Sequence, residues 1–117
     1  MTTRTTSVFL ATALALAAAL TIAKPAAGQD AVKKGQDVYT AQKCQLCHAI
    51  AGKGNKNNSL DGIGAKLSAD EIKQWITHPT EAAAKAKSTK KPPMPAKYGS
   101  LPAADIDGLV AYMQSLK

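Results

Sequence analysis

Both cysteines of the chain lie within five residues, in the stretch Cys44-Gln-Leu-Cys47-His48. Two residues separate the thiols, and a histidine follows the second cysteine directly. Thiols at this spacing can add to the two vinyl groups of one haem, and the adjacent imidazole can then coordinate the iron from the same side. This is the attachment signature of c-type haem. We therefore predict one haem c, held by thioethers to Cys44 and Cys47, with His48 as an iron ligand.

Three other uses of these residues have less support. A disulfide between Cys44 and Cys47 would close a very small loop and add little stability. A thiol redox motif belongs beside a βαβ unit, and the sequence shows no convincing strand. A zinc site needs further Cys or His ligands at suitable spacing, and the only other histidine, His78, stands directly before Pro79.

The second axial position of the iron decides between electron transfer and ligand chemistry. A thioether opposite the histidine raises the reduction potential and favours electron transfer. Met113 falls on the apolar side of an expected helix, where packing accounts for it. Met94 stands in Pro92-Pro93-Met94-Pro95, a stiff extended loop with no helical period to explain a methionine. Met94 is therefore the predicted ligand, and His78 is its competitor.

The beginning of the chain has the order of an export signal. The first seven residues are polar and include one arginine, residues 8–22 are apolar except for two threonines, and Ala26-Ala27-Gly28 offers small residues for cleavage. This order is typical of a secretory signal peptide, and the apolar run is shorter than the ~20 residues of a membrane span. We expect a cleavable signal over residues 1–28, a mature domain over residues 29–117 and a periplasmic location. An uncleaved membrane anchor is the alternative.

The expected mature domain is small, basic and poor in large apolar side chains. It holds 13 lysines, 8 acidic residues and no arginine. Its aromatic residues are Tyr39, Trp75, Tyr98 and Tyr112. A domain of this size is marginal on its own core, and a haem would add apolar surface for packing. The lack of arginine disfavours nucleic-acid binding, since bidentate recognition of bases and phosphates uses arginine, whereas the positive charge favours acidic partner proteins.

Helical spacing predicts three main helices joined by long loops. The first is expected over Ala31–Lys43, with Asp30 as its cap. The second follows the capping box of Ser68 and Glu71 and ends at His78-Pro79.

The third helix is expected over Pro102–Leu116, where an apolar stripe includes Leu109 and Met113. Residues 49–64 are rich in glycine and asparagine and are expected to form loop. Residues 81–91 are mainly alanine and lysine, and we expect at most one helical turn there, followed by loop. The expected fold class is all-α.

From about Gly35 to Leu116 the chain resembles a class I cytochrome c of the small bacterial type. The resemblance rests on the CQLCH motif and on Met94 in its proline-flanked loop. Further positions resemble the family's crossing of terminal helices and its middle helix. These are Gly35, Tyr39, Leu109 and Tyr112 at the crossing, and residues 59–68, Trp75-Ile76 and Pro79 in and before the middle helix.

The resemblance implies a class I cytochrome c fold around one covalently attached haem. It departs from the family at one place. Family members often carry a proline just before the equivalent of Leu60, and its carbonyl orients the histidine ligand. Here Asn58 and Ser59 occupy that stretch. Which carbonyl accepts the His48 Nδ1–H is therefore left open, and this hydrogen bond tunes the basicity of the imidazole.

These observations predict a soluble, monomeric electron carrier and not an enzyme. One haem edge should be exposed near the cysteines, with Lys43 and Lys97 placed to steer acidic redox partners. Three other functions are weighed against this one. They are a haem enzyme or gas sensor with a labile sixth position, a tethered subunit of a larger oxidoreductase that keeps its signal, and a basic structural module without haem.

Overall fold

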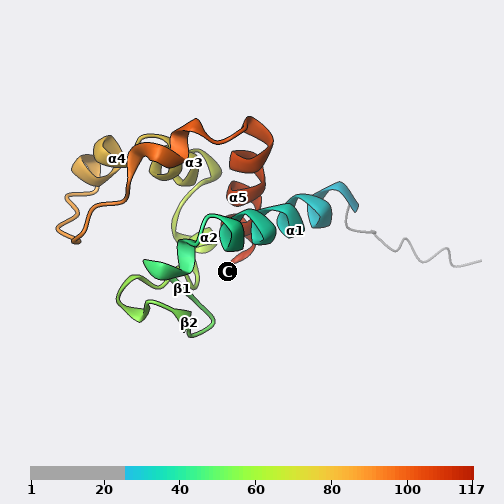
Figure 1. Cartoon of the computed structure of the whole chain (residues 1–117), viewed down its shortest axis with the longest axis horizontal. Coiled ribbons are helices and arrows are strands. Elements are labelled where there is room, and N and C mark those ends of the chain that lie inside the picture. Colours follow the sequence, from blue (N-terminus) through green and yellow to red (C-terminus); the bar gives the residue numbers. More distant parts are fainter. Residues whose placement is uncertain (1–25) are drawn as a thin grey trace, which may run out of the picture.

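The computed structural model describes residues 26–117, so the predicted signal peptide over residues 1–28 lies almost wholly outside the described residues. The described part is mainly helical, with one small hairpin (Figure 1). No helix within it is long and apolar enough to cross a membrane. The elements are α1 (Ala26–Ala41), α2 (Ile63–Lys66), α3 (Ala69–Thr77), α4 (Pro79–Lys85), α5 (Ala103–Ser115), the strands β1 (Ala49–Ile50) and β2 (Lys53–Gly54), and the 3₁₀ turns η1 (Cys44–Leu46), η2 (Lys56–Asn58) and η3 (Ala96–Ser100).

Helices α1 and α5 cross each other at closely apposed backbones (Figure 1). At the crossing, a Cβ on Gly35 would meet the carbonyl oxygen of Gly108 and would lie 2.6 Å from the Cβ of Tyr112. The Tyr39 and Tyr112 rings pack edge to face beside it, with centroids 5.8 Å apart and an interplanar angle of 84°, an arrangement that favours aromatic pairs. The predicted crossing is therefore present, and its close approach depends on glycine.

The apolar core joins these two helices to α3. Its buried members come from one face of each helix, as the helical period requires. They are Val38 and Tyr39 of α1, Ile72 and Ile76 of α3, and Ile106, Leu109 and Met113 of α5.

The start of α3 is the capping box that the sequence predicts. The Ser68 hydroxyl accepts a hydrogen bond from the Glu71 N–H at 3.2 Å, and the Glu71 carboxylate accepts one from the Ser68 N–H at 2.8 Å. Helix α3 ends at Thr77, and Pro79 opens α4 at a position where its missing N–H costs nothing. The predicted stop at His78-Pro79 is confirmed.

Three local expectations are wrong. Helix α1 begins at Ala26, so Asp30 lies within it and does not cap it. Residues 49–64 include the β1–β2 hairpin, the turn η2 and the start of α2, with short loops between them. Residues 79–85 form a full helix, because alanine and lysine are strong helix formers and Pro79 favours a helix start.

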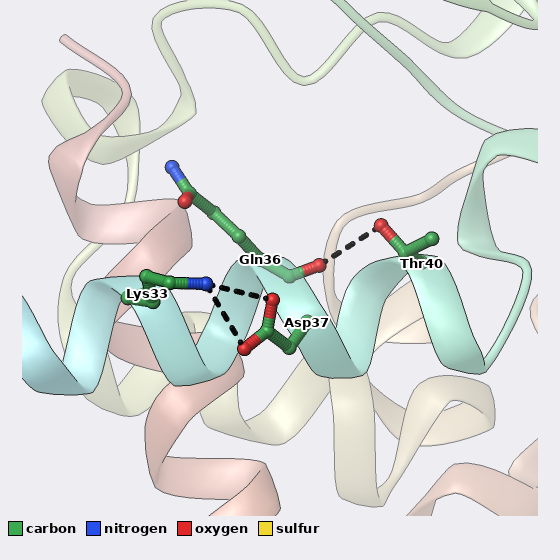
Figure 2. A network of polar contacts seen from close by, with 4 residues as sticks. All are labelled: Lys33, Gln36, Asp37 and Thr40. Atoms are coloured by element: carbon green, nitrogen blue, oxygen red, sulfur yellow. Dashed lines mark hydrogen bonds and ion pairs between the residues drawn. The ribbon is translucent and has the colours of Figure 1, made fainter.

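The exposed face of α1 carries polar contacts away from the crossing (Figure 2). Lys33 Nζ lies 3.2 and 3.3 Å from the two carboxylate oxygens of Asp37, one turn later. The Thr40 hydroxyl donates to the Gln36 carbonyl at 3.1 Å. Pairs at this spacing add a few tenths of a kcal/mol each, so this face is a solvated surface that supports the helix.

Candidate functional site

One cavity of about 440 Å³ is lined by residues of the CQLCH turn, of α3 and α5, and of the segment that follows α4. Small-molecule sites typically measure ~300–1,000 Å³ and are mostly apolar. Apolar side chains of α3 and α5, among them Ile76 and Leu109, form part of its wall. All four residues predicted to attach or ligate a haem also line it, namely Cys44, Cys47, His48 and Met94.

A tight turn after α1 brings the motif residues to one wall. Lys43 has the left-handed conformation, with φ 56°, and this ends the helix before the cysteines. The 3₁₀ turn η1 follows, and the Cys44 carbonyl accepts hydrogen bonds from the N–H groups of Cys47 at 3.1 Å and His48 at 2.9 Å. These backbone hydrogen bonds fix the positions at which the turn presents the Cys44, Cys47 and His48 side chains.

The imidazole of His48 is oriented by the carbonyl of Asn58. Nδ1 lies 3.3 Å from the Asn58 oxygen. A carbonyl only accepts, so Nδ1 carries the proton and Nε2 keeps its lone pair for a metal. Burial lowers the pKa of His48, and the Asn58 bond opposes this in part; the net direction favours the neutral ring that a metal ligand requires. The carbonyl that accepts the His48 Nδ1–H is therefore that of Asn58, in the stretch where family members often carry a proline.

The backbone of His48 is held from a second side. Its carbonyl accepts hydrogen bonds from the Asn55 N–H at 3.1 Å and from the Tyr39 hydroxyl at 3.4 Å. Burial and, less strongly, the neighbouring Cys44 raise the pKa of Tyr39 to about 12, so this donor stays protonated. Gly54, with φ 107°, lies so close that a Cβ there would meet the His48 carbonyl oxygen. Sequence reasoning assigned no such role to Gly54.

The two methionines of the described chain both line the cavity, one from a helix and one from a loop. Met113 is buried in the core on α5, as its place on the apolar stripe predicts. Met94 is partly buried and comes from the loop between α4 and η3. His78 is exposed, its Nδ1 lies 2.8 Å from the Thr77 hydroxyl, and it is absent from the cavity wall. The geometry therefore separates the competing histidine from the site.

The donor set and the wall fit a haem c. Two free thiols stand at one side of the cavity beside a neutral imidazole, and a thioether reaches it from another loop. Burial raises the pKa of Cys44 more than the nearby charge of Lys97 lowers it. Within residues 26–117, no cluster of three or more His, Cys, Asp or Glu side chains could hold a metal ion by itself, so the zinc interpretation finds no ligand set there.

Comparison with known proteins agrees with this chemistry. The family model for cytochrome c matches residues 32–117. The chain belongs to the cytochrome c family. No curated protein and no solved structure gave a match to the chain. The cofactor of this cytochrome is therefore a covalently attached haem c, its fold class is the predicted all-α one, and it belongs to a family of haem-based electron carriers.

Two of the lysines around the cavity of this cytochrome were singled out from sequence, and one was not. Lys43 lines the cavity. The Lys97 ammonium lies 5.1 Å from the centroid of the Tyr98 ring, which is itself part of the wall. Lys90 also lines the cavity. No sequence pattern singles out Lys90, because its ammonium donates to a backbone atom, the Asn57 carbonyl, that only the fold brings near it.

Proposed function

We propose that this cytochrome is a soluble periplasmic carrier of single electrons, with its haem attached to Cys44 and Cys47 and its iron held between His48 and Met94. The observation that carries the proposal is the meeting of the neutral His48 imidazole and the Met94 thioether at one apolar cavity. When bound, the haem supplies a one-electron couple. With His48 and Met94 as its two protein ligands, the iron would offer small oxidants no open coordination site.

Each residue of the chain has a limited task in this function. The Asn58 carbonyl holds the His48 ring in one tautomer, and the backbone bonds to the His48 carbonyl fix its position. The prolines around Met94 restrict its loop. A site that holds the same geometry in both redox states reorganises little, which favours fast electron exchange.

The distribution of charge supports acidic partner proteins. Residues 38–60 and 82–104, which carry the CQLCH turn and the Met94 loop, together hold eight lysines and no aspartate or glutamate. The other described residues hold five lysines and all eight acidic residues. A positive surface around the cavity would steer a negatively charged partner to it, in a weak and salt-sensitive complex.

Absorption spectroscopy of the holoprotein tests the ligand set. The expected result is a near-infrared sulfur-to-iron band in the ferric state and no spectral change when carbon monoxide is added to the ferrous state. Met94→Ala should abolish the band and admit carbon monoxide, whereas Met113→Ala and His78→Ala should keep the band. Carbon monoxide binding by the unmutated protein would contradict the proposal and favour a haem enzyme or gas sensor.

Small redox reagents test the charge argument without an identified partner. Ferricyanide is an anion, and a cobalt(III) phenanthroline complex is a cation of similar use. Lys43→Gln should slow oxidation by ferricyanide and speed oxidation by the cation, and both effects should shrink with added salt. Lys33→Gln, on the exposed face of α1, is the matched control and should change neither rate. Equal effects of the two variants would count against docking at the cavity.

Mass spectrometry of the exported protein and size-exclusion chromatography test location and assembly. A periplasmic product that begins at Gln29 and elutes as a monomer agrees with the proposal. A membrane-bound product that keeps residues 1–28 would favour the tethered subunit instead.

A further inference from the structure

The segment that carries Met94 has few anchors of its own. It runs from the end of α4 at Lys85 to the start of η3 at Ala96. Its three prolines carry no N–H, so they cannot donate backbone hydrogen bonds. They are Pro92, Pro93 and Pro95. Lys90 Nζ donates to the Asn57 carbonyl at 3.0 Å, the only hydrogen bond that joins residues 89–94 to another segment of the described chain.

The acceptor of this bond belongs to the turn that also orients His48. In η2, the Asn55 side chain accepts from the Asn57 N–H at 3.1 Å, and the Asn55 carbonyl accepts from the Asn58 N–H at 3.3 Å. Asn57 presents its carbonyl to Lys90, and the next residue, Asn58, presents its carbonyl to His48. One short, capped turn therefore contacts both sides of the cavity.

Met94 supplies the apolar contact of the same segment. Its side chain is partly buried against the core, while Pro92, Pro93 and Pro95 are exposed. Lys90 and Asn57 both line the cavity, as do His48 and Met94. The loop is thus held by an apolar contact at Met94 and a polar contact four residues earlier at Lys90.

We propose that Lys90 is a positioning residue, which ties the Met94 loop to the turn behind His48 and keeps the thioether at the cavity. This role rests on the proposed ligation of the iron by Met94. The Lys90 ammonium donates its hydrogen bond to Asn57 and not to His48 or Met94. Its hydrogen bond favours the closed arrangement of the loop, so its loss should raise the fraction of protein in which Met94 is displaced.

The test is a titration of the ferric holoprotein with imidazole, followed through the sulfur-to-iron band. Imidazole binds the iron only when the thioether leaves, so its apparent affinity measures how readily the loop opens. Loss of one hydrogen bond on an exposed surface corresponds to an increase of about two- to tenfold in that affinity for Lys90→Ala. Lys90→Arg retains a donor and should stay close to the unmutated protein. Lys91→Ala removes the same charge from an exposed neighbour whose ammonium makes no hydrogen bond within the described residues, and it is the matched control.

Each outcome bears on one of the two proposals. If Lys90→Ala and Lys91→Ala bind imidazole with the same affinity, while the unmutated protein shows its sulfur band, the positioning role is overturned and the ligation by Met94 stands. If the unmutated protein has no sulfur band, the ligation by Met94 fails, and the role of Lys90 fails with it. Tighter imidazole binding by Lys90→Ala alone, reversed in Lys90→Arg, supports the proposal.

Discussion

Replacing Gly35 by alanine should destabilise the protein, although alanine is the better helix former. In an open helix the exchange would gain about 1 kcal/mol. At the α1–α5 crossing, however, the new Cβ would meet the backbone carbonyl of Gly108 and lie 2.6 Å from the Tyr112 Cβ. Helix backbone cannot rotate out of the way, so the two helices must separate along the core.

The expected magnitude follows from these opposing effects. Forcing an extra methyl group into a packed interior costs about 1–3 kcal/mol, and this contact is at the severe end because the obstacle is backbone. After the gain in helix propensity, we expect a net loss of about 2 kcal/mol. For a domain of this size, this lowers Tm by about 8–16 °C.

The assay is thermal and denaturant unfolding of the holoprotein, followed by circular dichroism. Gly108→Ala provides a graded comparison. The new Cβ would lie 3.1 Å from the Gly35 nitrogen and 3.2 Å from the flexible Lys34 Cγ, so this variant should lose less stability than Gly35→Ala. Gln36→Ala, on the exposed face of α1, should be nearly neutral. A Gly35→Ala protein as stable as the unmutated one, or more stable, would refute the close crossing.

Three further predictions concern the site and α3. Gly54→Ala should lower the yield of folded holoprotein more than Gly52→Ala, because both need positive φ but only Gly54 would also press its Cβ against the His48 carbonyl; equal yields would contradict this. Ser68→Ala should cost about 0.5–2 kcal/mol in urea unfolding through loss of its cap, and an unchanged midpoint would count against the capping box. The pKa of Tyr39 is raised from 10.0 to about 12, so the unfolded chain loses this proton first and stability falls between those pH values. The Tyr39→Phe protein should lack this part of the loss of stability at alkaline pH, which is checked by measuring the free energy of unfolding across that pH range.

Local signals in the sequence predicted the elements whose determinants are local. The Ser68–Glu71 box, the proline stop after α3 and the apolar stripe of α5 each depend on a few neighbouring residues, and each is confirmed. The α4 helix was expected only as one helical turn, although the signals for a longer helix were present: Pro79 is a favourable first residue, and the alanines after it favour helix.

The missed features of the site depend on contacts between distant segments. The β1–β2 hairpin is too short to show a strand period, and Gly54 lets it lie close to the His48 backbone. Asn57 and Asn58 contact Lys90 and His48 through their backbone carbonyls, which a residue of any side-chain type could supply. Sequence reasoning could therefore name the residues that carry the chemistry, but not the backbone atoms that hold them.

The prolines of the Met94 loop also determine how its motion can be observed. Between Lys91 and Ala96 the backbone has a single amide proton, that of Met94, because Pro92, Pro93 and Pro95 have none. In a ¹⁵N-labelled sample, relaxation of this loop is therefore reported by one resonance. The Met94 methyl group adds a second, independent probe on the same residue, so selective methyl labelling would follow the loop and the thioether together.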